Sequence, residues 1–366
     1  MNLAISLICS ITILGSPSAQ LKSAALGRAG WEALQSGEIE KAAAAFEEAI
    51  ASNPREATLF LGAGIAAHLR GRDDAARDAL QRALEINRRL RPAAALLGAI
   101  VHEQGNLDLA IRTYEEALSA GPGDAEMAAR LEAWRKEAAV QSNFQQRFGD
   151  HFTVLFKGPA EQALATRATQ VLEAAYWRIG GALGEYPTQT ITVVLYTQQQ
   201  FRDVTRSPEW AAGAFDGSIR VPMRGALQNP QELERVLAHE LTHAIVRSLA
   251  PRGVPTWLNE GLAAVFEPVD IASEERLIRR AAVVVPLEKL QGNFGALSDR
   301  EAALAYAESA IAARMLLDRA GNALPLLLQD LGGGQPFSEV FARHTLMSVT
   351  DFQTALERRI KATSDR

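Results

Sequence analysis

Small and apolar residues recur in the first third of the chain with a period of 34 residues, between about residues 23 and 124. Five positions of the repeat are each held by one residue type or by a large apolar side chain. They are Gly30, Gly64 and Gly98; Gly37, Gly71 and Gly105; Ala42, Ala76 and Ala110; Phe46, Leu80 and Tyr114; and Ala49, Ala83 and Ala117. Small residues let paired helices approach closely, while the large side chain fills the space between units. The pattern predicts three stacked helical repeats.

This period and these residue types resemble the tetratricopeptide repeat. The resemblance implies an all-α solenoid over residues 23–148, in which three repeats are about the minimum for a stable stack. We expect the charged, amphipathic segment from Asp124 to Phe148 to form its capping helix. The concave groove of such a stack suits an extended or helical peptide of a protein partner. A spacer or a self-association module remains the alternative, because architecture alone names no ligand.

The pattern changes after residue 148. A β-type run from His151 to Phe156 precedes an amphipathic helical pattern from Pro159 to Leu183, and a β-branched strand follows from Thr190 to Tyr196. Asp216 and Gly217 then lie between two short apolar stretches, which predicts a tight hairpin. These elements predict a second, α+β domain over residues 151–366.

A helix with strong end signals follows the hairpin. Asn229 can cap it, Pro230 suits its first position, Glu232 completes a variant of the capping box, and Pro251 should end it. Its apolar face consists of Leu233, Leu237, Leu241, Ala244 and Ile245. A shorter helix should start at Pro255, and the rest of the chain reads as mainly helical.

The capped helix carries the motif His239-Glu240-Leu241-Thr242-His243 on the side opposite its apolar face. Histidines four apart lie one above the other on a helix, so both imidazoles can reach one zinc ion. Glu260, 16 residues after His243 and on the next helix, is the best candidate for the third ligand. Zinc in such a site activates a water, for which Glu240 would be the general base before it passes the proton to the leaving amine.

Three segments, His-Glu-Leu-Thr-His, Trp-Leu-Asn-Glu-Gly-Leu-Ala from Trp257, and Ala-Tyr-Ala-Glu-Ser from Ala305, resemble the peptidase MA-like domain of the gluzincin clan. Thermolysin and the zinc aminopeptidases belong to that clan. The resemblance covers residues 151 to about 360 and implies a zincin-like fold that binds one Zn²⁺ ion. By it, His239, His243 and Glu260 are the zinc ligands and Glu240 is the catalytic base.

The same resemblance suggests two further roles and shows two departures. Tyr306 would donate to the oxyanion. The hairpin residues Phe215, Asp216, Gly217 and Ser218 would bind the substrate backbone by strand addition. The gap before Glu260 is shorter than in thermolysin, and Ala264 stands where thermolysin has an acidic residue that supports its ligands.

The N-terminus and the overall charge narrow the setting. An apolar run over residues 3–14, followed by small residues, predicts a signal peptide or an N-terminal membrane anchor over residues 1–19. An ordinary buried N-terminal helix is the alternative. Export to the periplasm or outside the cell is expected, with membrane association only if the segment is uncleaved. Cys9, the only cysteine, lies in this segment, so His and carboxylate must hold any metal. A net charge of -5 without a basic stripe argues against a nucleic-acid partner.

These features predict an exported zinc metallopeptidase whose repeats recruit a peptide or protein substrate or another protein. We expect an endopeptidase, because no Gly-x-Met-Glu-Asn-like motif precedes the metal helix. One alternative is an assembly or chaperone-like scaffold in which the zinc domain is inactive or structural. Another is a zinc hydrolase that acts on a non-peptide amide.

Overall fold

The computed structural model describes residues 17–121, 124–205, 213–223, 229–251, 253–281, 284–292 and 294–364. Contacts divide the chain into two compact units. The first contains Met1–His68 and Arg72–Leu96, and the second contains Leu69–Gly71 and Leu97–Arg366. The predicted boundaries of 23–148 and 151–366 rest on sequence pattern and stay a prediction.

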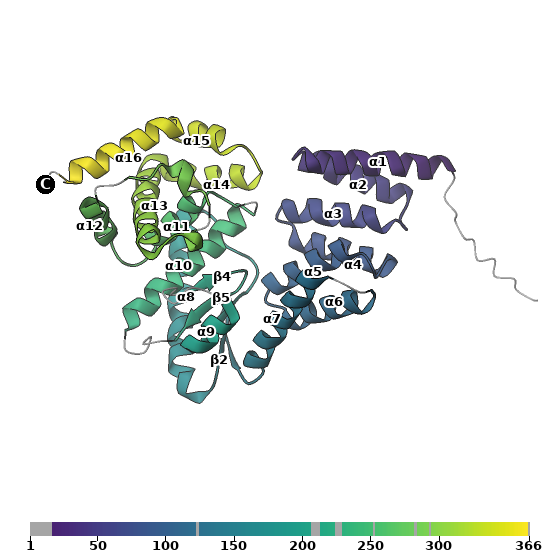
Figure 1. The fold of residues 1–366 in the computed structure, drawn as a ribbon, viewed down its shortest axis with the longest axis horizontal. Helices are drawn as coiled ribbons and strands as arrows, with labels where there is room; N and C mark the ends of the chain where they lie inside the picture. Colours follow the sequence, from purple (N-terminus) through teal and green to yellow (C-terminus); the bar gives the residue numbers. More distant parts are fainter. Residues whose placement is uncertain are drawn as a thin grey trace, which may run out of the picture. The chain divides into compact units, whose positions relative to one another are not determined.

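Stacked helices make up the described part of the first unit (Figure 1). They are α1 (Pro17–Gln35), α2 (Ile39–Ser52), α3 (Ala57–Leu69) and α4 (Asp73–Ile86), and the chain continues into α5 (Arg91–Glu103). Phe46 is fully buried, and a Cβ atom at Gly30 or Gly62 would lie within 3 Å of its ring. Gly62 is not a repeat position, but a Cβ atom at the repeated Gly64 would likewise lie 2.7 Å from Leu80. The repeated glycines therefore make room for the large apolar side chain, as the periodicity predicted.

Three turns of the repeat region, each at a repeated glycine, have the same backbone conformation. Gly37, Gly71 and Gly105 have φ angles of 74°, 70° and 76°. Only glycine adopts this left-handed region without steric cost. The recurrence of glycine every 34 residues thus follows from one repeated turn.

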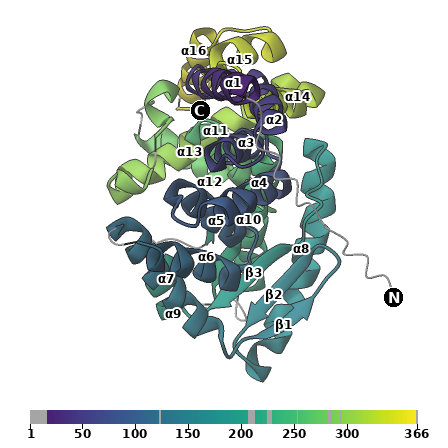
Figure 2. The same cartoon turned by 90° about the vertical axis from the view of Figure 1, so that its right-hand side faces the viewer.

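The second unit begins with the remaining repeat helices and a small mixed sheet (Figure 2). Helices α6 (Leu107–Ser119) and α7 (Ala125–Gln141) precede β1 (Gln145–Phe148). The expectation of a helix up to Phe148 was wrong for these last residues. β1 is polar and mostly exposed, so its sequence lacks the alternation of a strand, and antiparallel pairing with β2 (Phe152–Phe156) makes it one.

The sheet has the strand order β1-β2-β3-β5-β4. β3 (Ile191–Tyr196) lies parallel to both β2 and β5 (Ile219–Pro222), and β4 (Ala214–Phe215) pairs antiparallel with β5 at the edge. Helix α8 (Gln162–Leu183) packs on β2, and α9 (Gln198–Thr205) follows β3. The predicted strands and hairpin are present, and among the described residues β4 is the edge strand that lies beside α10 (Pro230–Leu249).

Helices form the rest of the second unit. They are α10 (Pro230–Leu249), α11 (Thr256–Val265), α12 (Ala272–Ala281), α13 (Asp299–Ala320), α14 (Leu324–Gly332), α15 (Phe337–Thr345) and α16 (Val349–Ser364). One hydrophobic core joins the sheet, α8, α10, α11 and α13. Helix α10 lies within this core, which fixes the position of the motif it carries.

The predicted N-terminal segment of residues 1–19 falls largely outside the described residues, which start at Pro17 within α1. Among the helices that the structure describes, no apolar stretch is long enough to cross a membrane.

Candidate metal centre

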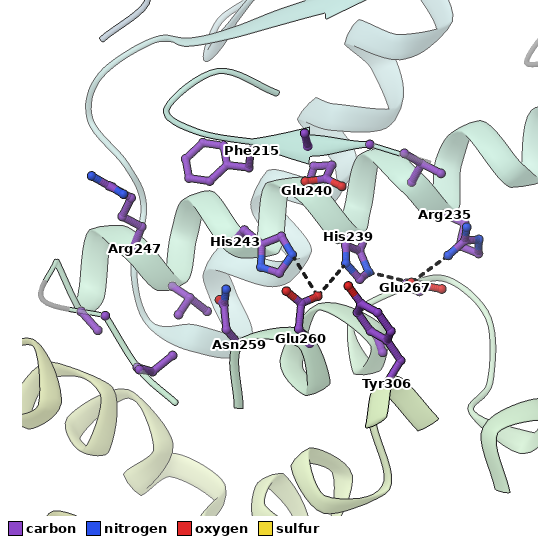
Figure 3. Close-up of a pocket in the computed structure, with 18 of the residues that line it drawn as sticks. Phe215, Arg235, His239, Glu240, His243, Arg247, Asn259, Glu260, Glu267 and Tyr306 are labelled. Atoms are coloured by element: carbon purple, nitrogen blue, oxygen red, sulfur yellow. Dashed lines mark hydrogen bonds and ion pairs between the residues drawn. The ribbon is translucent and has the colours of Figure 1, made fainter. Parts of the chain in front are cut away.

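Helix α10 sets the direction of both motif histidines. The side chain of Asn229 accepts a hydrogen bond from the backbone N–H of Glu232 at 3.2 Å, so the predicted cap is confirmed. The carboxylate of Glu232 binds Arg235 instead of closing a capping box. Leu237, Leu241 and Ile245 are fully buried in the core. With that face buried, His239 and His243 point to the other side (Figure 3).

Helix α11 brings Glu260 to the same place. It packs so closely on α13 that a Cβ atom at Gly261 would lie 2.2 Å from the backbone oxygen of Ser309. Trp257, Leu258 and Leu262 are buried beneath it. The glycine next to the ligand therefore allows the helix contact that aims Glu260 at α10.

The ligand atoms of His239, His243 and Glu260 converge, with all three within 4.8 Å of one another. Oε2 of Glu260 lies 3.5 Å from Nε2 of His239 and 3.6 Å from Nε2 of His243. Two ligands at about 2.05 Å from a tetrahedral zinc ion would be roughly 3.4 Å apart. Spacing and donor types, two imidazoles and one carboxylate, therefore fit a catalytic zinc site that leaves a coordination position open.

Glu267, a residue that the sequence analysis did not identify, supports this ligand set. Its Oε1 lies 2.8 Å from Nδ1 of His239 and accepts a hydrogen bond from Arg235 at 3.0 Å. A carboxylate on Nδ1 fixes the ring so that Nε2 faces the metal. Ala264 cannot supply the acidic side chain that supports the ligands in thermolysin, and Glu267, just beyond the end of α11, supplies a carboxylate instead. Arg235, one turn before His239 on the same face, was the available signal that an acidic partner was needed.

The charges of the cluster favour a cation at its centre. Burial would lower the pKa of His239, but hydrogen bonds to Glu260 and Glu267 and the charge of Glu240 raise it to about 10. Burial opposes ionisation of Glu260, yet its contacts with the two histidines lower its pKa. Burial raises the pKa of Glu240 to about 7, and nearby Glu260 adds to that rise. Three carboxylates thus surround two imidazoles.

The second histidine has a different environment from the first. Burial lowers the pKa of His243, which favours the neutral imidazole that a metal requires. Its Nδ1 is buried and has no hydrogen-bond partner within the described part of the chain. The side chain of Asn259 lies beside the ring in Figure 3. Within the described residues, His239 therefore has a carboxylate at Nδ1 that orients its ring, and His243 has none there.

A cleft of about 760 Å³ opens over these groups. β4 and the preceding Gly213 form one wall, and the backbone passes so close that a Cβ atom at Gly213 would lie 2.5 Å from Oε1 of Glu240. Glu240 points toward this strand in Figure 3. The predicted base, the metal ligands and one sheet edge consequently share one cleft.

The four predicted substrate-binding residues separate into two groups. Phe215 lines the cleft. Asp216, Gly217 and Ser218 form the turn between β4 and β5, where Asp216 pairs with Arg220 and a Cβ atom at Gly217 would meet the backbone of Glu103. Among the described residues of the hairpin, those preceding the turn are therefore the ones placed to meet a ligand.

Tyr306 reaches the cleft from α13. Its hydroxyl points toward Glu260 and His239 in Figure 3, and its ring packs edge-on against Phe294. Burial raises its pKa, and the charges of Glu260 and Glu240 raise it further, so the phenol stays protonated. A protonated phenol beside the ligands is a hydrogen-bond donor.

The family comparison concerns a different part of the chain. Residues 28–95 match the family model of the tetratricopeptide repeat. No curated protein matches the chain. The matched segment covers the first two of the three predicted repeats, and the structure shows helices throughout it.

Tetratricopeptide repeats indicate protein–protein interaction, so this segment is expected to bind a protein partner. The two repeat histidines have structural contacts. His68 pairs with Asp73 at 2.7 Å, and His102 lies 3.4 Å from Glu137 and stacks on Trp134. Neither belongs to the cluster of metal-ligand type found among the described residues.

Proposed function

We propose that the protein is a zinc-dependent peptidase. The observation that carries this proposal is the convergence of His239, His243 and Glu260 in a cleft that also holds the carboxylate of Glu240 and is lined by β4, the last strand of the described sheet. When bound, zinc would polarise a scissile carbonyl and lower the pKa of a water molecule. A cleft with these groups suits hydrolysis of an amide in an extended chain.

The residues around the cleft take separate roles in this proposal. β4 binds the backbone of the substrate as an added strand, with Phe215 against a side chain. Glu240 accepts the proton of the attacking water and delivers it to the leaving amine. Tyr306 donates a hydrogen bond to the oxygen that becomes negatively charged. Glu267 keeps Nδ1 of His239 occupied, which leaves Nε2 free for the metal.

The edge strand favours an internal stretch of peptide as the substrate, hence an endopeptidase. The tetratricopeptide repeats would recruit a substrate or partner protein, and residues 1–19 would direct export or anchor the chain. The alternative is a scaffold in which the repeats carry the function and the zinc domain is inactive. The repeat match favours protein binding under either proposal.

Metal analysis of the purified full chain, together with a peptide-library digest, tests the proposal. We expect one zinc per chain and cleavage by the wild type. Glu240→Gln should keep the zinc and lower kcat by about 10²- to 10⁴-fold, because it removes the proton acceptor. Glu234→Gln, a change at a partly exposed carboxylate on the same helix, should cleave like the wild type.

Two results would count against this function. A chain that neither contains metal nor gains activity on addition of zinc has no catalytic metal centre. A Glu240→Gln variant that binds zinc and acts on its partner as the wild type does would favour the scaffold.

A further inference from the structure

A buried polar cluster lies in the second unit away from the metal ligands. At its centre, the carboxylate of Glu137 on α7 is 5% exposed and the side chain of Arg220 on β5 is 3% exposed. Arg220 donates to Oε1 of Glu137 from Nη2 at 2.8 Å and from Nε at 3.3 Å. The same oxygen accepts from Gln141 at 2.9 Å and from the hydroxyl of Tyr196 at 3.3 Å.

The cluster connects α7 with three further elements through one carboxylate. Tyr196 ends β3, Arg220 lies in β5, and His102 of α5 lies 3.4 Å from Oε2 of Glu137. Burial opposes the charge of Glu137, but the contacts with His102 and Arg220 lower its pKa to about 2. Glu137 is therefore ionised at neutral pH and offsets the buried guanidinium, whose desolvation would otherwise be costly.

Arg220 links this cluster to the cleft. It pairs in register with Ala214 of β4, and its Nη1 also binds the carboxylate of Asp216 in the hairpin turn. β4 is only two residues long, so it makes few ladder bonds of its own. The side chain of Arg220 thus holds the hairpin at the turn while Glu137 holds Arg220 from the other side.

A small shift of this hairpin would reach the metal centre. The backbone at Gly213 adjoins Oε1 of Glu240, and Ala214 and Phe215 form the cleft wall. Displacement of a substrate-binding strand by about 1 Å can lower a rate about 10²-fold. The position of β4 consequently affects both the proposed substrate strand and the space around the proposed base.

We propose that Glu137 is a positioning residue which, through Arg220, holds the β4 edge over Glu240. The inference rests on the proposed peptidase function. It makes α7, the helix that follows the repeats, a part of the catalytic unit. Residues 151–366 alone lack the carboxylate that fixes one wall of their cleft.

Glu137→Gln in the full chain tests this role. The amide keeps the shape but removes the charge, so Arg220 retains only Asp216 as a carboxylate partner within the cluster described above. We expect backbone hydrogen exchange of residues 213–222 to become at least about tenfold faster. Zinc content should not change, because α10 and α11 carry the ligands. KM for a peptide substrate should rise, and kcat/KM should fall about 10- to 100-fold.

Glu132→Gln is the matched control, since Glu132 lies on α7 with its side chain 58% exposed. It should match the wild type in exchange, zinc content and kinetics. If Glu137→Gln does not fold, the double variant Glu137→Leu with Arg220→Met replaces both buried charges with apolar side chains, a change that buried ion pairs often tolerate. It too should show fast exchange in residues 213–222 with zinc retained.

Wild-type exchange over residues 213–222 in whichever variant folds, or an unchanged KM in a folded variant that binds zinc, would overturn the positioning role. A general loss of stability would lower the unfolding temperature without raising KM below that temperature. Absence of hydrolysis by the zinc-loaded wild type would instead refute the proposed function, and the exchange data would still show whether Glu137 fixes β4.

Discussion

The contact between Glu267 and His239 gives a quantitative prediction for the proposed metal centre. Glu267→Gln replaces a carboxylate that lies 2.8 Å from Nδ1 of His239 and is held by Arg235 at 3.0 Å. The side chain of Glu267 is 13% exposed, so water can replace little of the lost hydrogen bond to His239. A hydrogen bond to a charged group contributes about 1.5–3 kcal/mol, and 1.4 kcal/mol corresponds to a factor of ten. We therefore expect zinc affinity to fall about 10- to 100-fold.

Competition of the apo protein with a fluorescent chelator of known zinc affinity measures this change. Glu274→Gln is the control, because Glu274 lines the same cleft and carries the same charge, while the partner found for its carboxylate is Ser273. A general electrostatic effect would weaken zinc binding equally in both variants. Equal affinities in Glu267→Gln and Glu274→Gln would refute the specific role of the hydrogen bond to His239.

Two further predictions concern stability. Burial raises the pKa of Glu308 from 4.5 to about 7, so stability should fall as pH rises through this window, where only the folded chain keeps the proton. Glu308→Gln should be more stable than the wild type by about 3 kcal/mol in urea unfolding at pH 8 and equally stable at pH 4. Glu339→Gln, at an exposed position of α15, is the control and should be as stable as the wild type at pH 8. An equal gain for Glu308→Gln at both pH values would contradict this prediction. Gly261→Ala should lower the free energy of unfolding by about 1–3 kcal/mol and weaken zinc binding, because its Cβ atom would lie 2.2 Å from the backbone oxygen of Ser309. Gly292→Ala has open space and should change neither property; the prediction for Gly261 fails if its variant is as stable as this control.

The sequence predicted the elements with strong local signals. Asn229 and Pro230 mark the start of α10 at the residue where it begins, and a period of four places His239 and His243 on one side. Glycines at a spacing of 34 identified the repeat, and the left-handed backbone of Gly37, Gly71 and Gly105 explains why one set of them recurs. These signals lie within a few residues of the structure they determine, so no tertiary information was needed.

The remaining features depend on contacts between distant residues. Glu267 reaches His239 only because the chain turns back after α11, and the sequence directed attention to Ala264 instead. Arg220 and Glu137 are 83 residues apart, and neither belongs to a motif. β1 becomes a strand by pairing with β2, although its exposed polar side chains carry no β pattern. In each case the local structure or contact depends on a partner residue that the neighbouring sequence does not indicate.

The proposed metal centre has a further property that concerns the order of folding. All three ligands, Glu267 and Arg235 lie between residues 235 and 267, on two consecutive helices and the turn after them. The contacts among these residues close loops of at most 32 residues, whereas the contact between Arg220 and Glu137 that holds β4 closes a loop of 83 residues. Shorter loops close at a lower entropic cost and form earlier. The chain should therefore acquire the capacity to hold zinc before the wall that binds a peptide strand is in place. A nascent or partly folded molecule would then carry the metal without the means to cleave its neighbours.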